Sequence, residues 1–409
     1  MHNTQTKKNV PELRFPEFEG EWEEKKLGDE VSVLKGNKSQ YNIEVMTISA
    51  RNGWMSQKDR FSQVIAGKSL EKYVELNKGD LSYNKGNSKV APFGIVYRMP
   101  YSKALVPNVY KSFRVSNNIE SLFLEKYFHA KKLDRQLRKK ITSTARMDGL
   151  LNISDKEFFE SVISVPKIKE QQKIGTFFSK LDQQIELEEK KVSLLLEQKK
   201  GYMQKIFSRE LRFKDENGND FPEWEEKKLG NISKIIGGGT PTTSNQDYWD
   251  GEINWFTPME IGNKRYVSKS MRTITERGLQ KSSAKMLPAG TVLFTSRAGI
   301  GKTAILEKES TTNQGFQSIL PVQNELDSYY LFSLTPKIKQ FAEIHGAGST
   351  FVEISGKELS KMKIKLPSIY EQQKIGAFFS KLDQRIELAS QKVEQLKEQK
   401  RGLLQKMFV

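Results

Sequence analysis

The run Gly299-Ile300-Gly301-Lys302-Thr303 is the segment of this chain whose residue types come closest to a catalytic motif. It matches the end of the P-loop pattern, in which backbone amides and a lysine hold nucleotide phosphates. A P-loop needs a further glycine five residues before its last one, and the chain has Ser296 there. Two interpretations remain for this run: a glycine-rich turn between two strands, or a turn that presents Arg297, Lys302 and Thr303 to nucleic acid.

The chain has few residues that could support other kinds of catalysis. The chain has no cysteine, and its three histidines (His2, His129 and His345) lie far apart in the sequence, which disfavours thiolate, zinc and histidine-based sites. Asp247 and Asp250 have no third carboxylate at useful spacing and are expected to be turn residues. No Pro-Pro pair is present, so the usual motif for methylating an exocyclic amine of a base is missing. The sequence therefore predicts no catalytic residue and no metal site.

Composition points to an anionic partner. The chain has 67 Lys and Arg against 50 Asp and Glu, a net charge of +17, which favours DNA, RNA or an anionic membrane surface. Every apolar run is too short for a spanning helix, and the start Met1-His2-Asn3-Thr4 lacks the apolar core of a signal peptide. The absence of cysteine fits a reducing compartment. We expect a cytoplasmic protein without a membrane segment.

The elements that must position any binding residues occur twice. The helix start Glu170-Gln171-Gln172-Lys173-Ile174-Gly175 returns as Glu371-Gln372-Gln373-Lys374-Ile375-Gly376, and residues 21–28 return as residues 223–230 with one sequence, Glu-Trp-Glu-Glu-Lys-Lys-Leu-Gly. Between these constant segments the two halves diverge. One scaffold is therefore expected to hold two different recognition domains.

Each constant segment continues as a long helix. Apolar residues follow heptad spacing from Ile174 and again from Ile375, which predicts a coiled-coil seam. The two copies are expected to pair antiparallel, with Ile185 beside Leu396, and to relate the halves by a pseudo-twofold axis. Lys199 and Lys400 interrupt the seam and are expected to keep their ammonium groups in water. The alternative is that each helix only caps its own domain.

The fold class expected is α+β: two mixed α/β target-recognition domains, separated by two long helices that form an antiparallel coiled coil, in an internal pseudo-twofold repeat. Short β-rich runs broken by Gly, Asn and Ser turns support the mixed domains. The expected boundaries are residues 1–165 for the first recognition domain, 166–208 for the first spacer helix, 209–366 for the second recognition domain and 367–409 for the second spacer helix.

These residues resemble the specificity subunit of type I restriction-modification systems. The resemblance rests on the repeated Glu-Gln-Gln-Lys-Ile-Gly and on the run from Gly238-Gly239-Thr240-Pro241 through Trp249 to Pro258. Thr312-Asn313-Gln314-Gly315-Phe316 and Gly299-Ile300-Gly301-Lys302 resemble later parts of the same domain type. The first variable domain is similar more loosely, through residues 79–84 and Tyr97-Arg98.

The resemblance implies that each recognition domain reads one part of a bipartite site in double-stranded DNA, and that the paired helices set the unread gap. It implies two methyltransferase subunits, which carry S-adenosylmethionine, and restriction subunits with motor and nuclease activity, which use ATP and Mg. This chain would supply specificity, with no cofactor and no catalysis of its own. A coiled-coil scaffold for proteins and a P-loop phosphohydrolase are the rival functions.

Base recognition needs side chains that pair donors with acceptors, such as Arg with guanine or Asn and Gln with adenine. The candidates lie on polar, glycine-rich turns. For each one, a structural or solvent-facing role is at least as plausible, so the set is the prediction. In the first domain the candidates are Tyr83, Asn84, Lys85, Asn87, Lys89, Arg98 and Arg146, and in the second they are Thr242, Thr243, Ser244, Asn245, Arg297, Lys302, Gln317 and Ser349.

Overall fold

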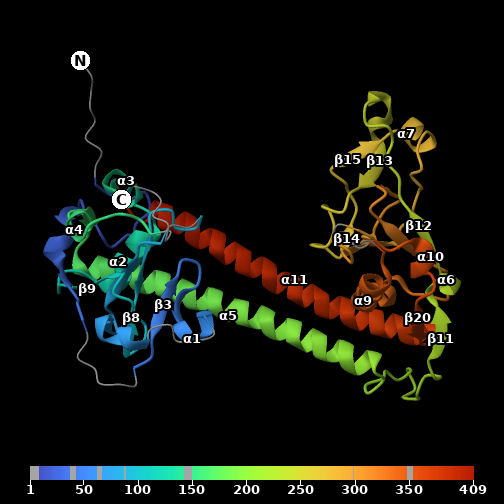
Figure 1. Ribbon diagram of the computed structural model, residues 1–409, viewed down its shortest axis with the longest axis horizontal. Helices are drawn as coiled ribbons and strands as arrows, with labels where there is room; N and C mark the ends of the chain where they lie inside the picture. Colours follow the sequence, from blue (N-terminus) through green and yellow to red (C-terminus); the bar gives the residue numbers. More distant parts are fainter. Residues whose placement is uncertain are drawn as a thin grey trace. The chain divides into compact units, whose positions relative to one another are not determined.

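The computed structural model describes residues 9–36, 43–61, 67–86, 89–141, 150–297, 299–347 and 353–409. The chain forms two compact units. The first unit is Met1–Lys191 with Ala389–Val409, and the second is Val192–Leu388. Each unit combines helices with sheets (Figure 1), so the expected α+β class is confirmed. No helix within the described ranges has the length and apolar character needed to cross a membrane.

The first unit is built on a four-stranded antiparallel sheet. Its strand order is β2-β9-β6-β7, and the small sheets β3-β4, β5-β8 and β1-β10 surround it. The strands are β1 (Glu23–Lys26), β2 (Val31–Val33), β3 (Met46–Ser49), β4 (Gly53–Ser56), β5 (Val74–Asn77), β6 (Leu81–Asn84), β7 (Ile95–Arg98), β8 (Lys103–Val106), β9 (Lys111–Val115) and β10 (Val162–Val165). The helices are η1 (Leu27–Glu30), α1 (Gln57–Phe61), η2 (Gly67–Lys72), α2 (Ser121–His129), α3 (Asp134–Lys140), α4 (Asp155–Phe159) and α5 (Ile168–Phe207).

The second unit repeats this plan and adds to it. Its main sheet has the order β12-β19-β16-β17-β14, and a second sheet has the order β15-β13-β18. The strands are β11 (Glu225–Lys228), β12 (Ser233–Gly237), β13 (Trp249–Phe256), β14 (Tyr266–Val267), β15 (Arg272–Ile274), β16 (Val292–Phe294), β17 (Thr303–Leu306), β18 (Thr311–Thr312), β19 (Gln317–Pro321) and β20 (Lys363–Leu366). The helices are α6 (Leu229–Ile232), η3 (Gln246–Tyr248), α7 (Glu276–Gln280), α8 (Ser328–Ser333), α9 (Thr335–His345), α10 (Gly356–Leu359) and α11 (Ile369–Lys406).

The repeated sequence segments fold alike in the two units. β1 pairs antiparallel with β10, and β11 pairs antiparallel with β20, with Glu23 opposite Val165 and Glu225 opposite Leu366. A serine caps the short helix before each closing strand: the Ser154 hydroxyl accepts from the Glu157 amide, and Ser355 does the same for Glu358. Serine caps of this kind satisfy a free amide of the first helical turn.

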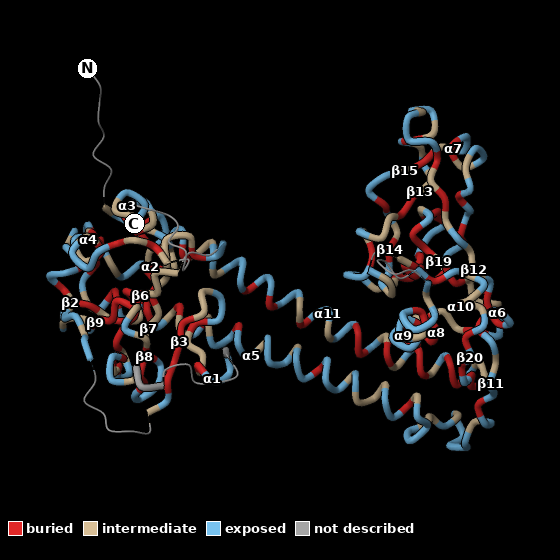
Figure 2. Tube along the Cα trace, in the orientation of Figure 1, coloured by how far each residue is buried: buried red, intermediate tan, exposed pale blue. Residues whose placement is uncertain are grey.

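The two long helices each contribute to both units. The beginning of α5 and the end of α11 share the core of the first unit, where Phe178 and Phe408 are buried and their rings lie 5.8 Å apart. The beginning of α11 and the end of α5 share the core of the second unit, where the rings of Phe207 and Phe379 lie 6.1 Å apart. Most of the predicted seam positions are buried, and red segments recur along both helices in Figure 2.

The seam lysines depart from the prediction. Within the first unit Lys400 reaches Asp182 at 2.5 Å, and within the second Lys199 reaches Asp383 at 2.6 Å. The Asp182 carboxylate also forms an ion pair with Lys126, whose Nζ lies 2.8 Å from Oδ2. Burial raises the pKa of Asp182, but Lys126 and Lys400 outweigh burial and hold that pKa below its usual value. The expectation that these ammonium groups lie in water is therefore wrong, because each one neutralises a carboxylate of the other helix.

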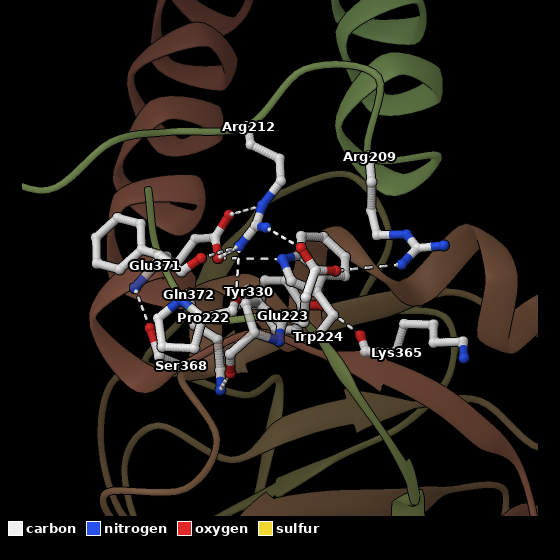
Figure 3. A network of polar contacts seen from close by, with 12 residues as sticks. Arg209, Arg212, Pro222, Glu223, Trp224, Tyr330, Lys365, Ser368, Glu371 and Gln372 are labelled. Carbon is white, nitrogen blue, oxygen red and sulfur yellow. Dashed lines mark hydrogen bonds and ion pairs between the residues drawn. The ribbon is translucent and has the colours of Figure 1, made fainter. Parts of the chain in front are cut away.

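The repeated glutamate anchors the second recognition domain to α11. The carboxylate of Glu371 is fully buried and accepts from Arg212 Nε at 3.2 Å, from Arg212 Nη2 at 2.9 Å and from Trp224 Nε1 at 3.0 Å (Figure 3). Glu170 accepts from Arg14 in the same way, at 2.8 and 2.7 Å. A planar guanidinium matches a carboxylate with two parallel bonds, which fixes the orientation of both groups.

The glutamine and glycine of the same segment complete the anchor. Gln171 donates to the Pro166 carbonyl and accepts from the Glu120 amide, and Gln372 repeats both contacts with Pro367 and Asp327. Gly376 lies against α8 so closely that a Cβ there would meet Asp327 Oδ1 at 2.8 Å. The repeated sequence is thus explained by packing: it holds each recognition domain against its long helix.

Candidate nucleic-acid interface

The segment that resembles a P-loop is a β-hairpin turn. β16 and β17 run antiparallel on either side of it, and Thr295 closes it by accepting from the Lys302 amide and donating to the Gly299 carbonyl, both at 2.9 Å. A P-loop instead leads from a strand into the first turn of a helix. The interpretation as a strand-to-strand turn is confirmed. Lys302 is exposed and Arg297 is partly exposed on this turn.

Three further loops of the second unit gather around this hairpin turn. The Lys302 stem packs on Gly262, where a Cβ would lie 3.2 Å from Cγ, and the Ser296 amide donates to the Gly315 carbonyl. The Gly239 amide donates to the Thr312 carbonyl, and Thr240 donates its hydroxyl to Gln314. We call residues 238–241, 257–262, 313–315 and the described part of 296–302 the loop cluster. Its exposed polar side chains are Gln314 and Lys302, and Thr240 and Arg297 are partly exposed.

The other described candidates of the second domain lie next to the loop cluster and on β19. Thr242, Thr243 and Ser244 are exposed, and Asn245 caps η3 by accepting from the Asp247 amide at 3.0 Å. These four precede β13, whereas the 257–262 turn follows it. The four residues also follow directly on Pro241, so this group adjoins the loop cluster at its 238–241 segment and extends from it toward β13. Gln317 lies on β19 beside Gly237 and Gly356.

The candidates of the first domain lie on an equivalent hairpin. β6 and β7 occupy the positions in their sheet that β16 and β17 occupy in theirs, and the connection between them carries Lys85 and the exposed Lys89. Both amide atoms of Asn84 are used within the protein, toward the Ile48 carbonyl at 3.0 Å and the Gly86 amide at 3.0 Å. Asn84 therefore shapes the hairpin, and the lysines are the groups it presents.

Two candidates of the first domain, Tyr83 and Arg98, make their contacts within the protein. Tyr83 is fully buried, stacks on Phe158 at 4.4 Å and donates its hydroxyl to the Phe93 carbonyl. Burial, the largest cause, raises its pKa. Its assignment to the reading surface is corrected on this ground, because alternation along β6 directs it into the core. The Arg98 guanidinium donates to the Ser121 hydroxyl at 2.8 Å, which turns it toward α2.

A basic recess lies beside the first hairpin, and the sequence prediction missed most of it. Lys35, Lys72, Lys85 and Lys111 line a recess of about 390 Å³, with Asp155 as its acidic residue. Lys111 is buried and paired with Asp155, while Lys35 and Lys72 are exposed. The lysines come from four separate segments, so no local charge run signals the recess. Such a cluster attracts phosphate groups.

Three candidates lie outside the described residues: Asn87, Arg146 and Ser349. Of the acidic pair considered for a metal, Asp247 lies in η3 and pairs with Arg277 at 3.0 Å. Asp250 has a positive φ of 60° at the start of β13, where the pairing with β15 shifts register, so it is a strand residue and not the expected turn residue. The described ranges contain no group of three or more His, Asp or Glu side chains placed to hold a metal ion.

Two units of one plan, each with a basic hairpin at the same place in its main sheet, define a duplicated binding protein of the α+β class. The sequence model of the type I restriction modification DNA specificity domain matches residues 19–198 and again residues 222–398, which is more than half of the chain. The chain therefore belongs to the family of type I restriction-modification DNA specificity proteins.

The individual proteins that this chain is similar to are also named as type I specificity subunits. The MjaIX type I restriction enzyme specificity subunit of Methanocaldococcus jannaschii is 40% identical over 186 residues, which are 44% of this chain and 43% of that relative. This match spans less than half of the relative's length. The putative MjaX specificity subunit of the same organism is 24% identical over 97% of this chain and 95% of its own length. The crystal structure of a type I restriction-modification S subunit from M. genitalium has a similar fold, with a TM-score of 0.64 and 15% identity over 98% of this chain and 99% of that chain.

Proposed function

We propose that this chain is a specificity subunit that binds double-stranded DNA and reads a target in two parts, one with each unit. The observation that carries the proposal is the double match of the DNA specificity domain, once on each half. The equivalent hairpins support it, because both halves present basic side chains from the same element of the sheet.

The chemistry of the two surfaces suits the reading of a duplex. Lysines contact phosphates and give affinity without sequence information, whereas Arg, Asn and Gln pair with base edges. In the second unit, Lys302 would contact a phosphate, and Arg297 and Gln314 would contact base edges. In the first unit, Lys89 and the basic recess are the phosphate contacts. The group Thr242–Asn245 extends the contact region of the second unit along the chain from the loop cluster.

The proposal includes partner subunits that carry out the reactions. Two methyltransferase subunits with S-adenosylmethionine would modify the target, and restriction subunits with ATP and Mg would cleave DNA. This chain would direct both to the site and catalyse neither reaction. The long helices are the constant surface available for partners, since their exposed positions repeat while the recognition domains differ.

We also propose that α5 and α11 form an antiparallel coiled coil that sets the unread gap between the two half-sites. The ion pairs Lys400 to Asp182 and Lys199 to Asp383 support this pairing, because each lies within one unit and both have the same register. Inserting one heptad after Lys190 and another after Gln391 keeps the seam. Seven residues add about 10 Å of helix, so the gap should grow by about three base pairs. An unchanged gap would show that the helices do not set it.

Domain exchange tests the central proposal. Residues 222–366 are replaced by those of a relative with a different target, keeping β11 paired with β20 inside the exchanged part. The chain is expressed with methyltransferase subunits, and methylated sites are mapped by methylome sequencing. Only one half-site should change, and the reciprocal exchange of residues 21–165 should change the other. A change in both half-sites after either exchange would contradict independent reading, and methylation without sequence preference would favour a protein scaffold.

A further inference from the structure

Two methionines, one in the loop cluster and one close to it in sequence, are almost completely exposed. Met259 and Met271 have 88% and 87% of their surface accessible, more than any other large apolar side chain in the described part of the chain. Met259 lies in the turn that follows β13, and Met271 lies just before β15, in the part of the second unit that carries β13, β15 and α7 (Figure 1). Single exposed apolar residues are common on protein surfaces, but two on adjoining loops form a patch.

The loops that carry the two methionines are joined by Glu260, which follows Met259 in its turn. The Glu260 carboxylate accepts from the Thr257 amide and hydroxyl, both at 2.7 Å, through Oε2, and from the Met271 amide at 2.6 Å through Oε1. Ser270 is bonded to β13 as well, by its amide to Asn254 Oδ1 at 3.0 Å. Both loops are therefore fixed to the same strand. The backbone that carries both methionines is thereby preorganised, and contact with a ligand needs no ordering of these loops.

The charges around the methionines point to a nucleic acid. Residues 257–272 contain four basic side chains, of which Arg265 is paired with Glu387, and one acidic side chain, Glu260, whose oxygens are already bonded. Lys264 and Lys269 are exposed, and Lys302 approaches through its contact with Gly262. Protein interfaces favour methionine but are poor in lysine, whereas DNA-binding surfaces combine lysines with apolar side chains that enter base steps.

We propose that Met259 and Met271 form an apolar wedge that enters a base step of the duplex and unstacks it. The inference rests on the proposed DNA recognition and adds a distortion of the half-site read by the second unit. Unstacking costs a few kcal/mol per step and bends the duplex. It also eases removal of a neighbouring base from the stack, which an enzyme acting on that base requires. The flanking lysines hold the phosphates on either side of the opened step.

The test uses the complex of this chain with its methyltransferase subunits and a duplex with 2-aminopurine at successive positions of the second half-site. The probe fluoresces more strongly when it is unstacked. In wild type, fluorescence should rise at one step. The double variant Met259→Gln with Met271→Gln should lose this rise and bind about ten- to a hundredfold more weakly, with an unchanged salt slope because no charge is removed.

Matched variants separate the possible causes. Met259→Leu with Met271→Leu keeps the wedge apolar and should behave as wild type, and Ile344→Gln changes another exposed apolar residue, 68% accessible on α9, and should have no effect. Equal fluorescence in wild type and the glutamine double variant would overturn the wedge. Failure of that variant to assemble with the methyltransferase would also overturn it, and would make the patch a protein contact. Absence of sequence-selective binding by wild type would reject the proposed function itself.

Discussion

The hydrogen bond between Trp224 and Glu371 can be measured against the equivalent position in the first unit, Trp22, which lacks it. Trp224 donates to the buried carboxylate of Glu371 at 3.0 Å, whereas Trp22, in the matching position, has a buried indole nitrogen with no hydrogen-bond partner among the described residues. Both side chains are buried, at 6% and 3% exposure, so replacing either with phenylalanine removes similar packing. The hydrogen bond is therefore the main difference between the two substitutions.

The expected magnitude follows from the chemistry of each site. Trp224→Phe loses a hydrogen bond to a charged group, worth about 1.5–3 kcal/mol, while Trp22→Phe removes an unsatisfied donor and recovers part of its desolvation cost. We expect Trp224→Phe to lower the free energy of unfolding of its unit by roughly 2–4 kcal/mol more than Trp22→Phe does in the first unit.

Native-state hydrogen exchange with mass spectrometry measures the two units separately in the full chain. Amides of β20 report on the second unit and those of β10 on the first, because each strand pairs within its own unit. A control adds Glu371→Ala to Trp224→Phe. If the two residues act through one bond, their effects should not be additive. Equal losses for Trp22→Phe and Trp224→Phe would refute the reasoning.

Three further outcomes are expected. Phe408→Ala should destabilise the first unit by about 3–5 kcal/mol and spare the second in the same exchange measurement, because Phe408 is buried against Trp22 and Phe178. Gly376→Ala should cost about 1–3 kcal/mol in urea unfolding because the methyl group meets the Asp327 cap, whereas Gly402→Ala, which meets nothing within 4 Å, should be neutral or slightly stabilising. Burial lowers the pKa of His129 to about 4, so its folded form stays neutral while the unfolded form takes a proton below about pH 6.5. Stability should therefore fall between pH 6.5 and 4, by roughly 2 kcal/mol from pH 7 to pH 5, and His129→Gln should lack this part of the loss when urea midpoints are compared at the two pH values.

The sequence by itself determined the features that depend on local periodicity and on repetition. Heptad spacing predicted the long helices and most of their buried positions, from Ile174 and from Ile375 onward. A glycine-rich run between β-rich residues predicted the hairpin turn at Gly299–Lys302, and the missing glycine at Ser296 excluded a P-loop. These properties are encoded by neighbouring residues, because backbone geometry and side-chain period are set within a few positions.

Only the tertiary structure decided which side chains meet. Tyr83 lies on a polar stretch that resembles a turn, yet the alternation of β6 directs its side chain into the core. There it stacks on Phe158, which comes from α4. The basic recess, the loop cluster and the pairing of Lys199 with Asp383 each join segments that are far apart along the chain. Such encounters depend on strand order and on the path of the whole chain, and no local pattern of residues specifies them.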